Sequence, residues 1–293
     1  MKIIVRSCGG LGNQMFQYAI GRAIALETEG EVLVDVSSFE REKRKFSLND
    51  FCLIDKIHVF SYKSWEVLAA IKVIKRLRKW GIGRNKIIFG NIIMETFPPS
   101  YFDFNFSVLR EKRCLFLEGF WQSEQYFARH REAILNDFTL NSFSSVAEQW
   151  DETIRSKGYS AVGLHIRRGD YVSEPSANRV HGVLSIGYYK NADKLLHGLG
   201  IKPTYFIFTD DVEWARENLS FSSDVFFVSE TGCRDVEEMI LMSRCSHAII
   251  ANSSFSWWSA WMNKNKDKVV VAPAFWFRNM ASDHIVPKEW YRI

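Results

Sequence analysis

The stretch IIVRSCGGLGNQMFQYAIGRAIALETEGEVLVDV, residues 3–36, decides the fold. Residues 3–6 form a short apolar run with the length of a buried strand, and a glycine-rich turn follows them. Apolar side chains then recur at helical spacing over about 13–27, and residues 31–36 return to a strand pattern. Strand, turn, helix and strand make a βαβ unit, which predicts a parallel sheet.

The same alternation of strands and helices begins again after a polar loop near residue 141. Because 293 residues exceed one ordinary domain, we expect two Rossmann-like domains, 1–150 and 151–293, with a ligand cleft between their parallel sheets. The further strands that we predict are 115–121, 161–166, 205–209, 225–228, 248–251 and, as the last, 269–272. The helices that we predict between them are 123–136, 146–156, 188–196, 212–218, 236–243 and 255–263.

Composition excludes some classes of protein. Hydrophobic residues make up 47% and charged residues 25%, which is globular composition, and a net charge of +4 does not indicate a nucleic-acid binder. The five cysteines include no Cys-x-x-Cys pair, which favours a reducing compartment. No signal peptide or long apolar segment is visible, so we expect a cytoplasmic protein. Asn-x-Ser sequons occur at Asn105, Asn218 and Asn252, and a glycan on Asn252 would obstruct a candidate site described below.

The segment His165-Ile166-Arg167-Arg168-Gly169-Asp170-Tyr171 directly follows the predicted strand 161–166. Guanidinium groups bind phosphate bidentately, and a departing diphosphate needs positive charge. We expect Arg167 and Arg168 to bind a diphosphate, with Asp170 orienting one of them. The alternative is an ion-pair network that only joins neighbouring strands.

The turn Gly9-Gly10-Leu11-Gly12 precedes Asn13 and Gln14. Glycines let the backbone approach a ligand, the helix N-terminus offers N–H groups to an anion, and both amides could bind the ligand. The alternative is a tight turn without a ligand. Met15 takes the place of the third glycine of a dinucleotide-binding fingerprint.

Two further polar groups follow predicted strands. Asn252, Ser253 and Ser254 open a helix, where they cap it, contact a phosphate or ribose, or do both. Asp210 and Asp211 follow strand 205–209. They either lie at the edge of the sheet where a ligand binds or only begin the next helix. The tryptophans Trp257, Trp258 and Trp261 fit a core better than a sugar-stacking surface.

Metal motifs are missing from the sequence. No Asp-x-Asp, His-Glu-x-x-His or Walker motif occurs, and the seven histidines are scattered. We therefore expect no metal and no cofactor, so that Arg167 and Arg168 supply the positive charge.

Residues 71–80 predict a basic amphipathic helix that ends at Gly81 and Gly83. Its cations are Lys72, Lys75, Arg76 and Lys79, and its apolar arc is Ile71, Val73, Ile74, Leu77 and Trp80. Two interpretations stay open: a solvated face packed on its domain, or peripheral contact with anionic lipid at the inner membrane face.

Taken together, the segments 10–19, 165–171 and 249–258 resemble the motifs of the α-1,2-fucosyltransferase family, glycosyltransferase family 11. Residues 120–127 resemble its middle segment, and 269–277 and 287–290 its C-terminal end, in the same order along the chain. The resemblance implies a GT-B fold and metal-independent, inverting transfer of L-fucose from GDP-β-L-fucose to O2 of a terminal galactoside.

The resemblance also implies residue roles. Arg167, Asp170 and Asn13 would be catalytic, and Trp121, Gln122 and Glu124 would bind the galactose-terminated oligosaccharide acceptor. The donor would be bound by Gly10, Gly12, Gln14, His165, Arg168, Asp210, Asn252, Ser253, Ser254 and Phe255. Trp121 replaces an expected smaller aromatic residue, which leaves acceptor specificity open. The general base also stays open, with Asp170 and Glu174 as nearby carboxylates.

Two other functions are weighed against this one. A nucleotide-dependent oxidoreductase lacks its third glycine and has only Asp35 as a candidate ribose-binding acid. A sugar-binding module fits the aromatic content of 15% but does not explain paired arginines at a strand end.

Overall fold

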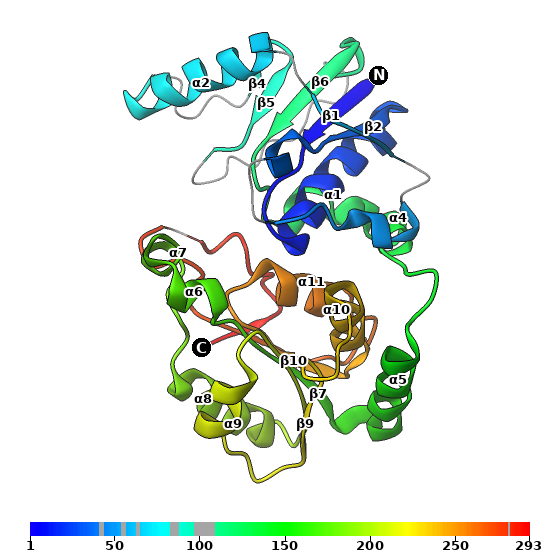
Figure 1. The fold of residues 1–293 in the computed structure, drawn as a ribbon, viewed down its shortest axis with the longest axis vertical. Coiled ribbons are helices and arrows are strands. Elements are labelled where there is room, and N and C mark those ends of the chain that lie inside the picture. The colour runs from blue at the N-terminus through cyan, green and yellow to red at the C-terminus, as the bar shows by residue number, and fades with distance from the viewer. Residues whose placement is uncertain (41–43, 54–56, 63–64, 83–87, 97–108, 281) are drawn as a thin grey trace. The chain divides into compact units, whose positions relative to one another are not determined.

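The computed structural model describes residues 1–40, 44–53, 57–62, 65–82, 88–96, 109–280 and 282–293. The sequon at Asn105 and the predicted helix end at Gly83 lie outside these residues. The chain divides into two compact units, Met1–Asn141 and Ser142–Ile293 (Figure 1).

The first unit contains a six-stranded sheet in the order β3-β2-β1-β6-β5-β4. Every pairing between its strands is parallel except the β4–β5 hairpin. Its strands are β1 Lys2–Arg6, β2 Glu31–Asp35, β3 His58–Phe60, β4 Ile88–Phe89, β5 Ile92–Met94 and β6 Cys114–Glu118. The parallel strands bring Arg6, Asp35 and Glu118, each the last residue of its strand, to one edge.

Two long helices pack on this sheet. Helix α1, Leu11–Thr28, buries most of its residues and lies so close to β1 that a Cβ on Gly21 would come within 2.4 Å of Val5. Helix α2, Trp65–Lys79, lies beside this sheet (Figure 1). It buries only Ile71 and Ile74, which pack on Ile4, Phe116 and other side chains of the sheet. Because Ile4 and Val5 point to opposite faces of β1, the two helices cover opposite faces.

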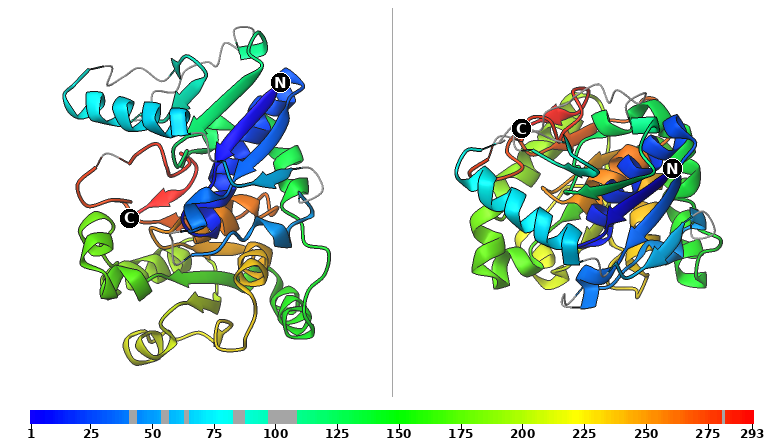
Figure 2. Two further views of the ribbon diagram at one scale, coloured as in Figure 1. Left: turned by 45° about the horizontal axis from the view of Figure 1, so that its top comes forward. Right: turned by 90° about the horizontal axis from the view of Figure 1, so that it is seen from above.

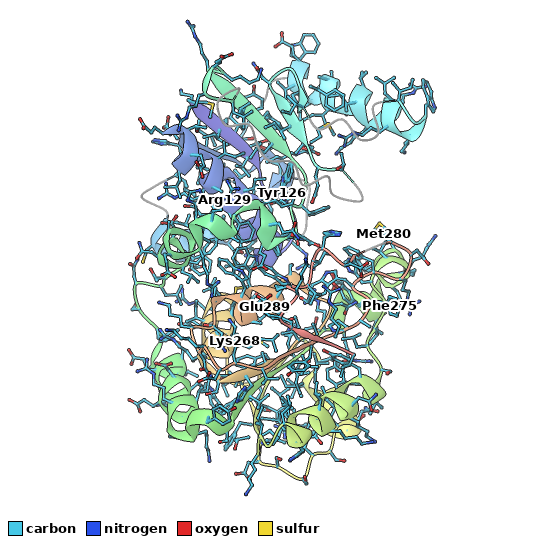
Figure 3. All side chains as sticks on the ribbon, turned by 180° about the vertical axis from the view of Figure 1, so that it is seen from behind. Tyr126, Arg129, Lys268, Phe275, Met280 and Glu289 are labelled. Atoms are coloured by element: carbon cyan, nitrogen blue, oxygen red, sulfur yellow. The ribbon has the colours of Figure 1, made fainter. Side chains whose placement is uncertain are left out.

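The second unit contains a six-stranded, fully parallel sheet in the order β12-β11-β10-β7-β8-β9. The strands are β7 Ala161–Ile166, β8 Thr204–Thr209, β9 Val225–Phe227, β10 His247–Ile249, β11 Val270–Ala272 and β12 Tyr291–Arg292. Strand β12 follows the loop after β11 and leads to the C-terminus (Figure 2). That loop carries the exposed side chains of Phe275 and Met280 (Figure 3).

Helices cover both faces of the second sheet. One face packs on α8, Ile186–Gly198, and α9, Val212–Asn218, through a core that includes Leu164 and Ile207. The other contacts α5, Ser145–Lys157, and α10, Asp235–Arg244, and α10 in turn packs on α11, Ser254–Met262. Trp257, Trp258 and Trp261 of α11 are at most 3% exposed, which confirms that they belong to the core.

The sequence missed several elements. Strand β12 lies beyond 269–272, so the prediction that this strand is the last is wrong. Strands β3, β4 and β5 and the short helices α6, Gly169–Ser173, and α7, Pro175–Val180, were not predicted. The single helix expected over 123–136 is instead two 3-10 turns, Glu124–Tyr126 and Ala128–His130, followed by α4, Arg131–Asp137.

Candidate active site

Arg167 and Arg168 directly follow β7, which lies between β10 and β8 in the second sheet. Arg167 Nη2 donates to Asp170 Oδ1 at 2.6 Å, and its Nη1 lies 2.8 Å from Asp210 Oδ2. Arg168 Nε donates to Asp211 Oδ2 at 2.8 Å. The register that pairs Ile166 with Thr209 explains this meeting, because the next residues of β7 and β8 must then lie side by side.

Asp210 fixes the turn that carries both arginines. Besides its bond to Arg167, it accepts a hydrogen bond from the backbone N–H of Arg168 at 2.8 Å. A Cβ on Gly169 would stand 2.5 Å from Asp210 Oδ2, so the turn requires glycine there. Asp211 begins the next helix, since it is the N-cap of α9 and accepts from Trp214 N at 3.2 Å. Asp211 therefore begins the next helix, as one of the two interpretations held, and a ligand role for Asp210 stays a prediction.

The cluster of these side chains holds two cationic and three anionic groups: Arg167, Arg168, Asp170, Asp210 and Asp211. The ion-pair network foreseen as an alternative therefore exists. The network does not use every N–H donor of the two guanidinium groups. The contacts among the described residues use two N–H groups of Arg167 and one of Arg168. Both side chains are partly exposed, at 23% and 17%, so their other N–H groups can meet a ligand.

Arg168 is further restrained by an aromatic ring. Its Cζ lies 4.0 Å from the centroid of Trp214, a distance typical of a cation–π contact. A ring on the guanidinium face and a carboxylate at Nε together fix the plane of the group. The arrangement can present a preoriented positive charge to an anion at this edge of the sheet.

His165 is a buried neutral residue rather than a charged one. Burial, with a further contribution from the charge of Arg167, lowers the pKa of His165 to about 3. Its ring stacks on Phe255 with the ring centroids 5.3 Å apart, and its Nδ1 has no hydrogen-bond partner among the described residues. The stack joins the end of β7 to the first turn of α11.

Asn252 ties several loops together. Its side-chain Nδ2 donates to the main-chain carbonyl of His181 at 2.9 Å and lies 3.4 Å from the carbonyl of Trp276. The main-chain carbonyl of Asn252 accepts from the Tyr171 hydroxyl at 3.1 Å. The ring of His181 stacks on Tyr171 at 4.6 Å. Asn252 is 1% exposed, so its role here is to hold the loops around the candidate site together from inside the second unit.

The start of α11 differs from the capped helix expected from the sequence. Ser253 stands at the N-cap, but its hydroxyl does not cap the helix. The expectation of side-chain capping there is wrong, because the carbonyl and amide groups of Asn252, not a serine hydroxyl, organise this turn. Ser254 and Phe255 are partly exposed in the first turn, where the N–H groups of a helix can bind an anion.

In the first unit, the glycine turn leads from β1 into α1. Gly9 has a φ of +76°, a left-handed backbone conformation that favours glycine, and a Cβ there would also stand 2.8 Å from Asn13 Nδ2. Gly10 is the N-cap of α1 and faces the Arg44 guanidinium, which a Cβ on Gly10 would approach to 3.2 Å. Gly12 is buried in the first turn of the helix.

The two amide side chains of this turn differ. Asn13 is partly exposed, and its Oδ1 accepts from Gln122 Nε2 at 2.7 Å. Gln14 is 1% exposed, and its amide bonds to the carbonyls of Gly9 and Lys45, both at 2.9 Å, and to Ser47 N at 2.8 Å. Gln14 therefore anchors the neighbouring loop, while Asn13 and Gln122 face solvent as a pair.

The residues expected to bind the acceptor lie after β6. Trp121 is 1% exposed and has a φ of +58°, which is uncommon for a bulky residue. Its indole packs edge-on against Tyr126 at 5.2 Å, and its Nε1 has no partner among the described residues. Glu124 begins a 3-10 turn and is partly exposed. The neighbouring Phe120, at 43% exposure, is the aromatic ring that this loop presents to solvent.

Sequence reasoning missed Glu95, Arg44 and His181. Glu95 directly follows β5, and the apolar run Ile92-Ile93-Met94 was the signal that would have marked it as a residue at a strand end. Burial raises the pKa of the Glu95 carboxyl to about 7, although the amides of Trp121 and Phe120 favour its charged form.

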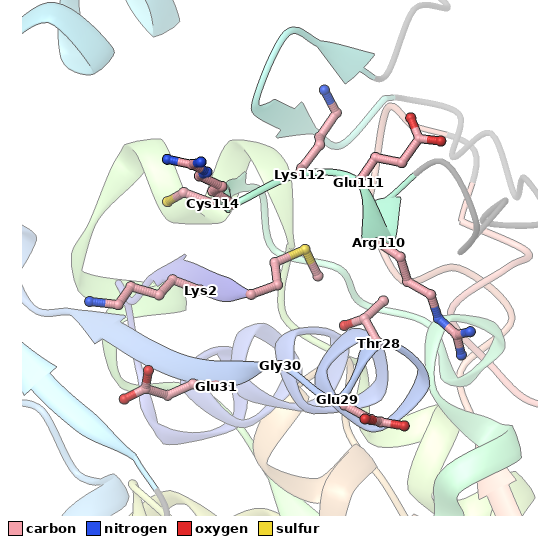
Figure 4. Close-up of a pocket in the computed structure, with 11 residues that line it drawn as sticks. Lys2, Thr28, Glu29, Gly30, Glu31, Arg110, Glu111, Lys112 and Cys114 are labelled. Atoms are coloured by element: carbon pink, nitrogen blue, oxygen red, sulfur yellow. The ribbon is translucent and has the colours of Figure 1, made fainter.

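A separate hollow of about 860 Å³ lies on the first unit (Figure 4). Its lining includes Lys2, Glu31 and Cys114, which are the first residues of β1, β2 and β6. Ligands of parallel sheets bind at the opposite edge, beyond the carboxyl ends of the strands, so this hollow is not the candidate site.

Neither a metal-binding cluster nor a membrane-spanning helix occurs in the described part of the chain. It holds no group of three or more His, Cys, Asp or Glu side chains placed to bind a metal ion. Of the helices that the structure describes, none has both the length and the apolar composition needed to cross a bilayer.

Solved structures share this fold. The fucosyltransferase NodZ from Bradyrhizobium matches with a TM-score of 0.52 at 17% identity, over 88% of this chain and 91% of that one. POFUT1 in complex with GDP-fucose matches with a TM-score of 0.51 at 13% identity, over 92% of this chain and 97% of that one. These matches, with the two mostly parallel sheets, confirm the predicted GT-B-like fold.

Relatives by sequence are similar over different lengths. An alpha-1,2-colitosyltransferase of Escherichia coli is 32% identical over 300 residues, 99% of this chain and 98% of the relative. A galactoside alpha-(1,2)-fucosyltransferase 1 of Leontopithecus chrysomelas is 28% identical over 157 residues, 50% of this chain and 42% of the relative. The model of the family described as Glycosyl transferase family 11 matches residues 2–293. The chain therefore belongs to glycosyltransferase family 11 and is a glycosyltransferase.

Proposed function

We propose that this glycosyltransferase moves L-fucose from GDP-β-L-fucose to O2 of a terminal galactoside, with inversion at the anomeric carbon and without a bound metal. The names of the relatives, alpha-1,2-colitosyltransferase and galactoside alpha-(1,2)-fucosyltransferase 1, support transfer to a 2-hydroxyl group. The GDP-fucose complex of POFUT1, whose fold is similar, is in keeping with this donor.

The observation that carries the proposal is the pair Arg167 and Arg168 at the carboxyl end of β7, held by Asp170, Asp210 and Asp211. As the bond between fucose C1 and the phosphate oxygen breaks, negative charge grows on the diphosphate. A guanidinium that is already oriented stabilises this charge without reorganising. Phosphate oxygens would accept from the N–H groups that the carboxylates leave, and from the first turn of α11.

The proposed roles divide between the two units. Arg167 and Asp170 act at the diphosphate, and Arg168, His165, Asp210 and residues 252–255 complete the donor pocket. In the first unit, Asn13 acts at the scissile bond, and Gly10, Gly12 and Gln14 are proposed to contact the donor. The acceptor is proposed to contact the loop that carries Trp121, Gln122 and Glu124.

The direct test is incubation of the protein with GDP-fucose and lactose in EDTA. We expect a trisaccharide with fucose α-1,2-linked to galactose, identified by NMR of the product. No product with any galactoside, another linkage, or activity that EDTA abolishes would refute the corresponding part of the proposal.

A second donor is compared because a relative that matches nearly the whole chain is named for colitose. Colitose is the 3-deoxy form of L-fucose, so the two donors differ by a single hydroxyl. Competition between GDP-fucose and GDP-colitose at equal concentration decides between them. Preference for GDP-colitose would support the proposed reaction but show that colitose, not fucose, is the sugar transferred.

We propose that residues 1–150 serve the acceptor and 151–293 the donor, close to the division between the compact units at Asn141 and Ser142. The Arg cluster lies in the second unit, which supports this assignment. Hydrogen exchange of the whole protein with GDP is expected to protect 165–171 and 252–256. Protection confined to the first unit would contradict it.

Helix α2 supports a further proposal, peripheral contact with anionic lipid at the inner membrane face. Trp65, Val73 and Trp80 are 74%, 56% and 65% exposed, beside the exposed cations Lys72 and Arg76. Exposed tryptophans and cations together suit a lipid headgroup region. Co-sedimentation with phosphatidylserine vesicles is expected, and it should disappear on neutralising Lys72, Arg76 and Lys79. No binding to anionic vesicles removes the idea.

A further inference from the structure

A cavity of about 320 Å³ opens in the first unit where β1, β5 and β6 end. This is the edge of the sheet at which ligands of parallel sheets bind, and the volume is near the lower limit of small-molecule pockets. Its lining combines charged side chains with one exposed aromatic ring. The lining residues are Arg6, Cys8, Ser38, Lys75, Arg78, Met94, Glu95, Glu118, Gly119 and Phe120.

An ion-paired triad forms one wall of this cavity. Glu118 accepts from Arg6 Nη1 at 3.3 Å and from Lys75 Nζ at 2.5 Å, so the carboxylate lies between two cations. Arg78 donates to the carbonyls of Glu95 at 2.7 Å and Met94 at 3.3 Å. Helix α2 therefore supplies two of the cations, and β1 supplies the third.

Glu95 forms another wall and is fixed from several directions. Its carboxylate accepts from Phe120 N at 2.7 Å, and its own N–H donates to Glu118 O at 3.0 Å. A Cβ on Gly119 would come within 2.5 Å of Glu95 Cβ, so the loop after β6 can pack against Glu95 only if residue 119 is glycine. The side chain is 7% exposed, yet it lines the cavity.

The aromatic ring at the mouth of the cavity is Phe120. Its exposure contrasts with that of the next residue, Trp121, whose left-handed backbone turns the indole into the core. Gln122 then bonds to Asn13, so the cavity and the glycine turn share one short loop. The loop thus joins the cavity to the residues proposed to act at the sugar.

We propose that this cavity binds a neutral pyranose of the acceptor glycan, with the sugar face on Phe120 and its hydroxyl groups bonded to Arg6, Glu118 and Glu95. This inference rests on the proposed function, of which it names the acceptor subsite. A sugar ring offers an apolar face and vicinal hydroxyls, which match an aromatic ring beside charged acceptors and donors.

The first test is steady-state kinetics of Phe120→Ala and Glu95→Gln with lactose as acceptor. Loss of the ring contact should raise the acceptor KM roughly fivefold. Loss of a charged hydrogen-bond acceptor should raise it about tenfold. The donor KM should change less than about twofold, because the diphosphate contacts lie in the other unit. Tyr159→Ala and Glu132→Gln are matched controls, since both side chains are exposed and neither lines the cavity.

The pH dependence separates a binding role from a structural one. The charged groups that face Glu95 are Arg6, Lys75, Arg78 and Glu118, with the Cys8 thiol. As the Glu95 carboxyl loses its proton near pH 7, its hydrogen bond to a sugar hydroxyl should strengthen. The wild-type acceptor KM should therefore fall as pH rises from 6 to 8, and Glu95→Gln should flatten this profile.

A second readout needs no donor at all. Saturation-transfer NMR with lactose should show sugar contact with the wild-type protein and loss of it in Phe120→Ala. Normal transfer with unchanged acceptor KM in both cavity variants would overturn the subsite and leave the function standing. Lactose binding that depends on Phe120, without transfer from either GDP-sugar, would uphold the subsite and refute the function. Neither binding nor transfer would overturn both.

Discussion

The substitution Glu95→Gln should make the first unit more stable at alkaline pH. The folded protein holds the Glu95 carboxyl at a pKa of about 7, against an ordinary value of 4.5, because burial penalises its charge. Below about pH 4.5 both folded and unfolded states carry the proton, and between 4.5 and 7 only the folded state does. The wild type therefore loses stability as pH rises through this window.

The size of this loss follows from the two pKa values. Moving from 4.5 to about 7 corresponds to about 3 kcal/mol of unfolding free energy. Glutamine occupies a similar volume, keeps an acceptor for Phe120 N and does not ionise. The stability gain of Glu95→Gln over wild type should thus be about 3 kcal/mol larger at pH 8.5 than at pH 4.5.

Hydrogen exchange of peptides from β5 and β6 measures this locally, because two units need not unfold together. Glu238, in the second unit, also has a pKa raised to about 7, but it is present in both proteins and cancels in the difference. Glu132→Gln, an exposed position, should show no such pH dependence. Parallel pH profiles for wild type and Glu95→Gln would refute the reasoning.

Three other variants or titrations test the remaining structure. Arg167→Ala should keep the fold and reduce turnover by about 10²-fold or more, as measured with GDP-fucose and lactose, and near-normal rates would contradict its role. Gln14→Ala should lower the unfolding free energy in urea by about 1–3 kcal/mol, because three partly buried hydrogen bonds between its amide and the backbone are lost; a change below about 0.5 kcal/mol would contradict its anchoring role. His165 should stay neutral at pH 5 in NMR spectra, since its folded pKa is about 3. The stability that it contributes is present above pH 6.5 and lost as pH falls toward 3, whereas titration near pH 6 would contradict its burial.

Much of the fold could be predicted because each long element carries a local signal. Strand β7 is apolar except for His165, and α1 repeats its apolar side chains at helical spacing, so both were found at nearly their observed bounds. The short elements could not be found this way. Strand β12 has two residues, and only its pairing with β11 makes it a strand.

The candidate site was predicted in its chemistry but not in its contacts. Arg167 and Asp170 stand three positions apart in one turn, and their ion pair was expected. The contribution of Asp210 depends on the register of β7 and β8, which joins residues 43 positions apart in the case of Arg168 and Asp211. Glu95 shows the same limit, because its environment is built by a loop that follows β6 and a helix that precedes it.

The buried amide of Asn252 has a practical consequence for producing this protein. Its Nδ2 donates to main-chain carbonyls inside the second unit, and it is also the acceptor nitrogen of an Asn-x-Ser sequon. An oligosaccharide attached there during synthesis in a eukaryotic secretory host would replace one hydrogen of the Asn252 amide. It would also prevent the loop at His181 from packing against Asn252. Bacterial expression avoids this lesion, because bacterial cytoplasm does not attach N-linked glycans to Asn-x-Ser sequons.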